Sequence, residues 1–289
     1  MVQAVPPGDV TAIVNVGDDV ELHGLHISPD LDTITYTVAG AIDLERGWGL
    51  GGETWHAMEA LARYPRARRW FNLGDRDLAT HLYRTDRLRS GASLSEVSAE
   101  VAEAWELGLR LLPVTDDRLQ TRVTVTGEGE IGFQEYFVER HHDVAVTAVR
   151  FDGAEQARPA PGVLAAIGDA RRVVVAPSNP IVSIDPVLTV PGVRAAVEAR
   201  RAEVVAVSPI IAGAALKGPA DRLLRELGHD ASVVGVARLY APFVGTLVID
   251  EADAGHAAAV EAAGVRCVVA PTVMHGVAEA TRLAEVVLA

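Results

Sequence analysis

Short apolar runs alternate with amphipathic segments along much of the chain. Runs rich in β-branched residues are typical of buried strands, and the chain contains six of them: "TAIVNV", "RRVVVA", "AEVVAVS", "ASVVGVA", "TLVID" and "RCVVA". Between several of these runs, segments such as "PADRLLREL" and "AGHAAAVEAA" carry apolar residues at helical spacing. This alternation predicts an α/β fold, a Rossmann-like parallel sheet covered by helices.

The middle of the chain departs from this alternation. Three segments predict helices, the last with Ser93 or Ser95 as its N-cap: "ETWHAMEALARY", "DLATHLYRTDRL" and "SLSEVSAEVAEAWEL". The segments "RVTVT" and "IGFQEYFV" flank the turn-rich "GEGE" and predict a hairpin, with "VAVTAVRF" as a third strand. We therefore expect a single domain over residues 1–289, with a helical insert and a small β-hairpin element at about residues 45–150.

Composition narrows the class of protein. The 289 residues carry 26 basic and 39 acidic side chains, a net charge of −13, which argues against a nucleic-acid or anionic-membrane partner. The single cysteine, Cys267, lies in an apolar run, so we expect a buried thiol and no disulfide within the chain. No apolar stretch approaches the roughly 20 residues of a membrane span, and the first residues show no signal-peptide pattern. We expect a soluble protein of the cytoplasm.

Four carboxylates crowd into "NVGDDVELHGLHISPDLDT": Asp18, Asp19, Asp30 and Asp32. The first two follow a predicted strand, and ligands of parallel α/β sheets bind where strands end. Oxygen ligands at this density suit Mg²⁺, which is commonly shared with phosphates. Aspartate is also common in turns. The residues alone therefore leave two alternatives, a metal site and a solvated turn.

Two later loops have the chemistry of phosphate binding. In "APSNPIVSIDP", Ser178, Asn179 and Ser183 follow an apolar strand, where backbone N–H groups and hydroxyls can hold phosphate oxygens. In "SPIIAGAALKGPADR", Ser208 ends a strand and Lys217, the only lysine of the chain, stands beside a glycine. The alternatives are a helix cap for the first loop and a solvated lysine for the second.

A fourth segment, "WFNLGDRDLATH", places Asp75, Arg76 and Asp77 at the start of a predicted helix, where acids also complement the helix dipole. The histidines lack the spacing of a zinc site. The glycine cluster "GWGLGG" does not match a dinucleotide-binding fingerprint.

Taken in order, the motifs closely resemble the 2-phospho-L-lactate transferases of coenzyme F-420 biosynthesis, whose actinobacterial members are phosphoenolpyruvate transferases. The resemblance covers about Val14 to Lys217, with weaker similarity beyond, and rests on "NVGDD", "PDLDT", "ERGWG" with "ETWHAM", "WFNLGDRDLATHL", "LLPVTDDRLQTRV", "FQEYFV", "APSNPIVSI" and "SPIIAGAALKGPAD". It implies a Mg²⁺-dependent transfer of phosphoenolpyruvate or 2-phospho-L-lactate from a guanosine diphosphate-linked donor. The acceptor would be the ribityl hydroxyl of the deazaflavin Fo, and GMP would leave.

The resemblance also implies roles for individual residues. Asp32 and Asp19 would be catalytic, and Asp18, Asp19 and Asp32 would bind the metal. Fo would contact Asp32, Asp75, Arg76 and Asp77. The donor nucleotide and its phosphates would contact Ser178, Asn179, Pro180, Ser183, Ser208, Lys217 and Gly218. A homodimer is the expected assembly, and the composition, rich in Ala, Arg and Val, favours the enolpyruvate donor of bacterial members.

The chain departs from the family pattern at two places. Family members have a strand and a glycine-rich "GGxGGAR"-like loop before the strand that carries "NVGDD", and this chain starts at "MVQAVPPGDVTAIV". Pro271 stands where the family usually has an acid before the threonine. Two rival interpretations follow from the shared fold: a nucleotide-sugar-binding regulator without catalytic activity, and an inactive paralogue. "LGDRDLATH" and "FQEYFV" favour the transferase.

Overall fold

The computed structural model describes residues 1–289 and is an α/β fold, as the sequence predicts. The helices are α1 (Pro29–Val38), α2 (His56–Leu61), α3 (Asp77–Arg89), α4 (Leu94–Ala104), α5 (Val163–Asp169), α6 (Asp185–Thr189), α7 (Val193–Ala199), α8 (Ala220–Glu226), α9 (Val233–Tyr240), α10 (Ala257–Ala262) and α11 (Val277–Leu288). The strands are β1 (Thr11–Val14), β2 (Val20–Leu22), β3 (Leu25–Ile27), β4 (Arg110–Pro113), β5 (Gln120–Val125), β6 (Gly129–Gly132), β7 (Val146–Asp152), β8 (Val173–Val175), β9 (Val204–Val207), β10 (Ile210–Ile211), β11 (Ala214–Ala215), β12 (Thr246–Ile249) and β13 (Arg266–Val269).

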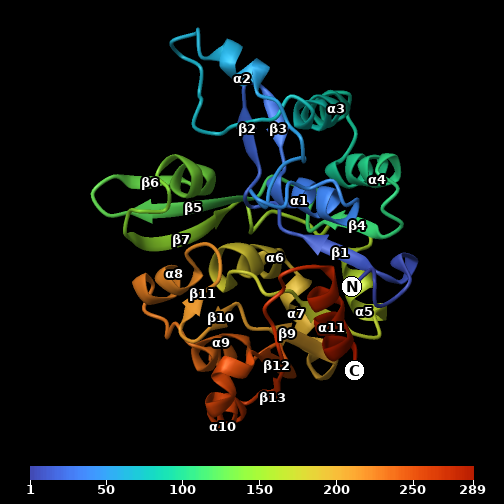
Figure 1. Ribbon diagram of the computed structural model, residues 1–289, viewed down its shortest axis with the longest axis vertical. Coiled ribbons are helices and arrows are strands. Elements are labelled where there is room, and N and C mark those ends of the chain that lie inside the picture. Colours follow the sequence, from blue (N-terminus) through green and yellow to red (C-terminus); the bar gives the residue numbers. More distant parts are fainter.

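The C-terminal half, from β8 to the end of the chain, is built on a four-stranded parallel sheet with the order β13-β12-β9-β8. The residues before β8 form the N-terminal half. Strand β9 is buried at every position, because helices cover the faces of the sheet, as a parallel sheet requires. Figure 1 shows the C-terminal half at the bottom, in yellow to red. Strands β1 and β4 form a separate parallel pair in the upper half.

The middle of the chain adds the helices and the antiparallel element that the sequence predicts. Strands β6, β5 and β7 form an antiparallel sheet that projects to one side of the molecule (Figure 1). Helices α2, α3 and α4 lie above and beside the β2–β3 hairpin, with α2 at the top of the view. The N-cap of α4 is Ser93, which accepts a hydrogen bond from Glu96 N in a capping box.

One cluster of 44 buried apolar residues runs from Val14 to Val265 and includes residues of both halves. The two halves therefore share a core. No single helix is long and apolar enough to cross a bilayer. One bent pair, Pro180–Thr189 with Val193–Ala199 at an angle of 96°, is long and apolar enough only when the two segments are counted together, by length and composition alone.

Two local predictions are wrong. "ASVVGVA" is not a strand but the start of α9, whose buried residues recur at helical spacing behind the N-cap Ser232. "IGFQEYFV" is a strand only to Gly132 and continues as a π-helix, Glu135–Glu139. "PDLDT" forms the first turn of α1, where Pro29 is favoured because a proline lacks the N–H that would be unpaired there.

Candidate active site

The residues around the end of β1 hold one another in a close-packed turn. The Asn15 side chain accepts a hydrogen bond from Gly17 N at 2.7 Å and donates one to the Asp30 carboxylate at 3.0 Å. A Cβ on Gly17 would lie 2.6 Å from Thr121 Oγ1. Glycine is therefore needed here for close approach of two segments. The turn brings the end of β1 against the first turn of α1.

Asp18 and Asp30 are two carboxylates at this turn, Asp18 buried and Asp30 half-buried. Asp18 is 7% exposed, and its Oδ1 has no hydrogen-bond partner. Burial, and then the charge of Asp30, raise the pKa of Asp18 well above its usual value. Burial also raises the pKa of Asp30 to about 6, against the hydrogen bond from Asn15. The structure thus concentrates negative charge where water is largely excluded, which is costly without a cation.

Asp19, the next residue, points to different partners. Its carboxylate accepts hydrogen bonds from His26 Nε2 at 2.9 Å and from Ser28 Oγ at 2.7 Å. Burial raises the pKa of Asp19, and these bonds act in the opposite direction. Asp19 thereby ties the segment after β1 to β3 and to the N-cap of α1, and it does not line the cavity.

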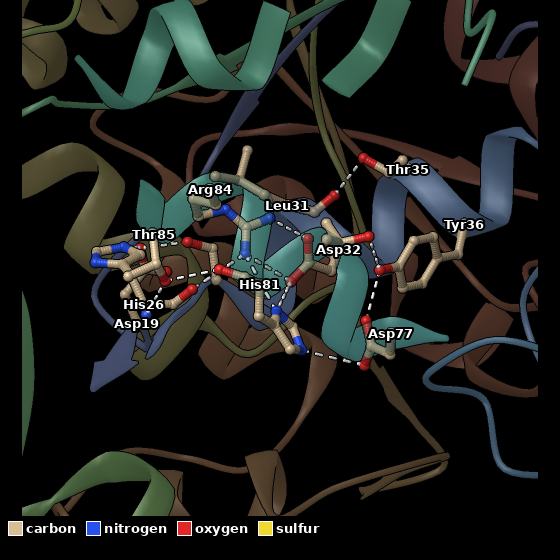
Figure 2. Close-up of polar contacts among 12 residues, drawn as sticks. Asp19, His26, Leu31, Asp32, Thr35, Tyr36, Asp77, His81, Arg84 and Thr85 are labelled. Atoms are coloured by element: carbon tan, nitrogen blue, oxygen red, sulfur yellow. Dashed lines mark hydrogen bonds and ion pairs between the residues drawn. The ribbon is translucent and has the colours of Figure 1, made fainter. Parts of the chain in front are cut away.

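Asp32 lies two residues after Asp30 in α1 and forms a buried ion pair with Arg84 of α3 (Figure 2). Arg84 Nη1 donates to Asp32 Oδ2 at 3.1 Å, and Nη2 donates to the other oxygen. His81 Nδ1 lies 3.6 Å from the same carboxylate. A two-point contact of this kind fixes the plane of the carboxylate as well as its position.

Asp77 continues the same network at the start of α3 (Figure 2). Tyr36 OH donates to Asp77 at 2.5 Å and lies 2.9 Å from Thr80 Oγ1. His81 Nε2 lies 3.3 Å from the other oxygen of Asp77. Burial opposes ionisation, but the bonds and charge supplied by His81 hold the pKa of Asp77 below its usual range.

Asp75 and Arg76 have structural contacts instead of facing the cavity. The Asp75 carboxylate accepts hydrogen bonds from the N–H groups of His56 and Ala57 at the start of α2, at 2.9 Å each. Arg76 Nη1 donates to Gly51 O at 2.8 Å. In return Glu53 accepts from the N–H groups of Arg76 and Asp77 at the start of α3. Asp75, which precedes α3, therefore stabilises the start of α2, and Glu53, which precedes α2, stabilises the start of α3. Sequence spacing does not reveal this exchange.

The C-terminal half contributes loops of small polar residues. Asn179 Oδ1 accepts from Ile181 N at 3.0 Å and so caps the π-helix Pro180–Ile184. Ser208 Oγ is hydrogen-bonded to its own loop at Ile210. Lys217 forms no ion pair, and a Cβ on Gly47 would lie 3.5 Å from its Nζ. The ammonium of Lys217 thus extends from this half toward the loop that contains Gly47.

These segments line one cavity of about 1020 Å³ between the two halves. Nine of the residues predicted from the sequence line it: Asp18, Asp32, Asp77, Ser178, Asn179, Ser183, Ser208, Lys217 and Gly218. Asp19, Asp75, Arg76 and Pro180 do not, although each is within two residues of one that does. The cavity is of the size that holds a cofactor-sized ligand. The structure also adds residues that the site prediction lacked: Asp30, Trp48, Trp70, Phe71, Gln134, Phe137 and His81.

The paired carboxylates give a pH-dependent prediction. Because the pKa of Asp30 rises from 3.8 to about 6 on folding, its ionisation destabilises the fold progressively between these values and fully above about 6. In metal-free protein, Asp30→Asn should therefore raise the free energy of unfolding at about pH 7.5, by up to about 3 kcal/mol. Below about pH 4 the gain should vanish. Urea unfolding across this pH range checks it, with the exposed Asp86→Asn as the control. A gain that does not change with pH would contradict the assignment.

An α/β cavity with buried carboxylates on one side and small polar loops with a lysine on the other is typical of enzymes that bind phosphorylated substrates. Residues 2–273 match the family model "2-phospho-L-lactate transferase CofD". The chain therefore belongs to this family of transferases, and the resemblance seen in the motifs is confirmed.

Similar proteins that carry names support the same family. The chain is 46% identical over 276 residues to a phosphoenolpyruvate transferase of Streptomyces griseus, covering 94% of this chain and 87% of that one. It is 45% identical to the phosphoenolpyruvate transferase of Kitasatospora aureofaciens, covering 98% and 90%. A crystal structure of a UPF0052-family protein from Bacillus halodurans has the same fold, with a TM-score of 0.60, 14% identity, and coverage of 96% and 91%.

Proposed function

We propose that the chain transfers a phosphoenolpyruvyl group, or its 2-phospholactyl counterpart, from a guanosine diphosphate-linked donor to the ribityl hydroxyl of the deazaflavin Fo. The observation that carries this proposal is that segments 18–32 and 178–218, which are distant in sequence, line one cavity. The names of the relatives support the enolpyruvyl donor over the lactyl one. The new bond joins the acceptor oxygen to the phosphorus that bears the three-carbon acid, and the bond from that phosphorus to GMP breaks.

The carboxylates on the carboxyl side of β1 fit a magnesium ion. Asp18 Oδ1 is buried and has no partner, and the charge of Asp30 adds to the cost of ionising Asp18. Their oxygens are the ligand type that Mg²⁺ prefers. Asp18 and Asp30 would hold the ion, while Asp19, predicted as a ligand, would position them through His26 and Ser28. A bound Mg²⁺ supplies neutralisation of the charge on the diphosphate.

The buried network on α1 and α3 would position the acceptor. Asp32 faces the cavity with its plane fixed by Arg84, and Asp77 is fixed by Tyr36 and His81. A hydroxyl of the ribityl chain can donate to Asp32, which then takes the proton as the oxygen attacks phosphorus. Phosphoryl-type transfer depends mainly on alignment and charge neutralisation, so a rigidly held carboxylate is sufficient.

The loops of the C-terminal half would hold the donor. The backbone around Ser178 and Asn179 is fixed by the Asn179 cap, and Ser183 lies one turn further on the same side of the cavity. Lys217, with no acidic partner, supplies a positive charge for the diphosphate. Because that ammonium extends toward Gly47, donor binding would also draw the two halves together across the cavity.

The test is turnover with purified protein, Fo, an enolpyruvyl-diphosphoguanosine donor and Mg²⁺, following GMP release and the new product by chromatography. Lactyl donor in a parallel reaction decides which three-carbon acid is preferred. Binding of Fo is measured by its own fluorescence, with a nucleotide sugar as the comparison ligand. Failure to bind Fo, together with binding of the nucleotide sugar, would overturn the proposal in favour of a regulator. The homodimer and the cytoplasmic location stay predictions, the first checked by light scattering.

A further inference from the structure

Two pairs of aromatic side chains lie at the N-terminal side of the cavity. The Trp48 and Trp55 rings are 6.1 Å apart, and the Trp70 and Phe71 rings are 5.8 Å apart in an edge-on arrangement. Trp48, Trp70 and Phe71 line the cavity. The C-terminal half lines the same cavity without a single aromatic residue. The aromatic lining of the cavity thus comes from the N-terminal half, and it includes Phe133 and Phe137, the latter beside Gly218.

Trp48 is held in place although it is 43% exposed. The Arg46 guanidinium carbon lies over both indoles, 5.4 Å from the centre of Trp48 and 5.3 Å from that of Trp55. Arg46 is itself fixed by Asp43 at 2.9 Å and by Leu50 O at 2.9 Å. A cation over one face of an indole orients the ring and leaves the opposite face for another partner.

The loop that carries Trp48 is held by hydrogen bonds within it. Asp43 Oδ1 accepts hydrogen bonds from the N–H groups of Glu45 and Arg46, and Asp43 N donates to Gly49 O at 3.0 Å. Gly47 and Gly49 flank Trp48 with φ values of +73° and +66°, which few other residues adopt. An exposed tryptophan on a pre-organised loop binds a ligand without a large loss of conformational entropy.

We propose that Trp48, backed by Arg46, stacks on the flat tricyclic ring of the acceptor, with Trp70 and Phe71 forming the neighbouring apolar wall. This inference rests on the proposed function. Both proposed substrates carry a flat heteroaromatic ring that could stack here: the acceptor carries the deazaflavin and the donor carries guanine. The acceptor is favoured because the aromatic side chains and the acceptor-positioning carboxylates Asp32 and Asp77 come from the same half of the chain.

The experiment compares Trp48→Ala, Trp48→Phe and Leu44→Ala by titration with Fo and, separately, with GDP. Leu44 is on the same loop, is 87% exposed and does not line the cavity, so it controls for disturbance of the loop. Trp48→Ala should raise the Kd for Fo about tenfold, the scale of a lost base–aromatic stack, and Trp48→Phe should recover most of it. The Kd for GDP should stay within about twofold of its starting value, because no lost stack contributes to it.

Each other outcome has a distinct meaning. If Trp48→Ala binds Fo as the parent protein does, the stacking inference is overturned and the proposed transfer stands. If Trp48→Ala weakens GDP and not Fo, the aromatic lining holds guanine, and the inference as stated is wrong. If the parent protein binds GDP but not Fo, the proposed function itself fails. Melting temperatures of all three variants should match the parent, which separates loss of binding from loss of folding.

Discussion

Asp18→Asn is expected to lower kcat/KM for transfer by at least about a hundredfold, because it removes a ligand oxygen from the proposed metal site. The fold should be retained or become more stable, since the pKa of Asp18 is raised by burial and its ionised form is costly in metal-free protein. Calorimetric titration with Mg²⁺ measures the loss of the site directly. Turnover at saturating Mg²⁺ measures its consequence.

The control for this variant is Asp86→Asn, a substitution of the same type at an exposed position of α3 that does not line the cavity. It should change neither Mg²⁺ binding nor turnover. Asp18 is a cleaner choice than Asp32, whose replacement by asparagine is also expected to abolish turnover. Asp32→Asn leaves Arg84 buried without its counter-charge, so a loss of activity there mixes chemistry with folding. Full activity of Asp18→Asn would contradict the placement of the metal.

Arg84→Met is expected to lower the free energy of unfolding by about 3–5 kcal/mol, the cost of leaving one charge of a buried pair uncompensated. The Arg84 side chain is 3% exposed and that of Asp32 is 7% exposed. The Arg84 side chain also joins α3 to α1, so its loss removes the contact that fixes Asp32 at the cavity. Urea unfolding at neutral pH gives the change in stability, and the midpoint should fall without a change in slope.

The matched control is Arg87→Met, three residues along the same helix. Arg87 pairs with Glu100 at 2.7 Å, but both side chains are about a third exposed, so the loss should be small. The double variant Asp32→Asn/Arg84→Met should recover part of the stability lost by Arg84→Met, because no unpaired charge remains. Equal losses for Arg84→Met and Arg87→Met would show that the buried pair contributes no more than an exposed one.

The pattern of the chain predicted most of the sheet. Strands β8, β9, β12 and β13 were predicted from short apolar runs, since a strand buried on both faces needs apolar residues throughout. The same rule failed at α9, because a run of valines bounded by Ser232 also satisfies a short helix buried on one side. Periodicity cannot separate the two in a segment of this length. The N-cap was the signal that could have decided it.

The residue types of the site were also evident from sequence, but their partners were not. The motifs pointed to Asp18, Asp32, Asp77 and Lys217, and all four line the cavity. Only the folded chain shows that Asp30 completes the pair with Asp18, or that Asp75 stabilises α2 instead of facing the cavity. These relations depend on segments that approach each other across long stretches of chain, and local spacing contains no information about them.

Helix α3 shows the division most clearly. Its apolar spacing predicts a helix, but the sequence does not show which of its side chains are buried. In the structure Leu82 is 58% exposed, and the buried stripe is polar: Asp77, Thr80, His81, Arg84 and Thr85. A polar stripe can be buried only where every charge finds a partner. Asp32 and Tyr36 of α1 supply those partners. The sequence thus determined that this segment is a helix and which polar groups it offers. The tertiary structure alone decided which face is buried and which carboxylates meet, because that choice depends on partners brought from elsewhere in the chain.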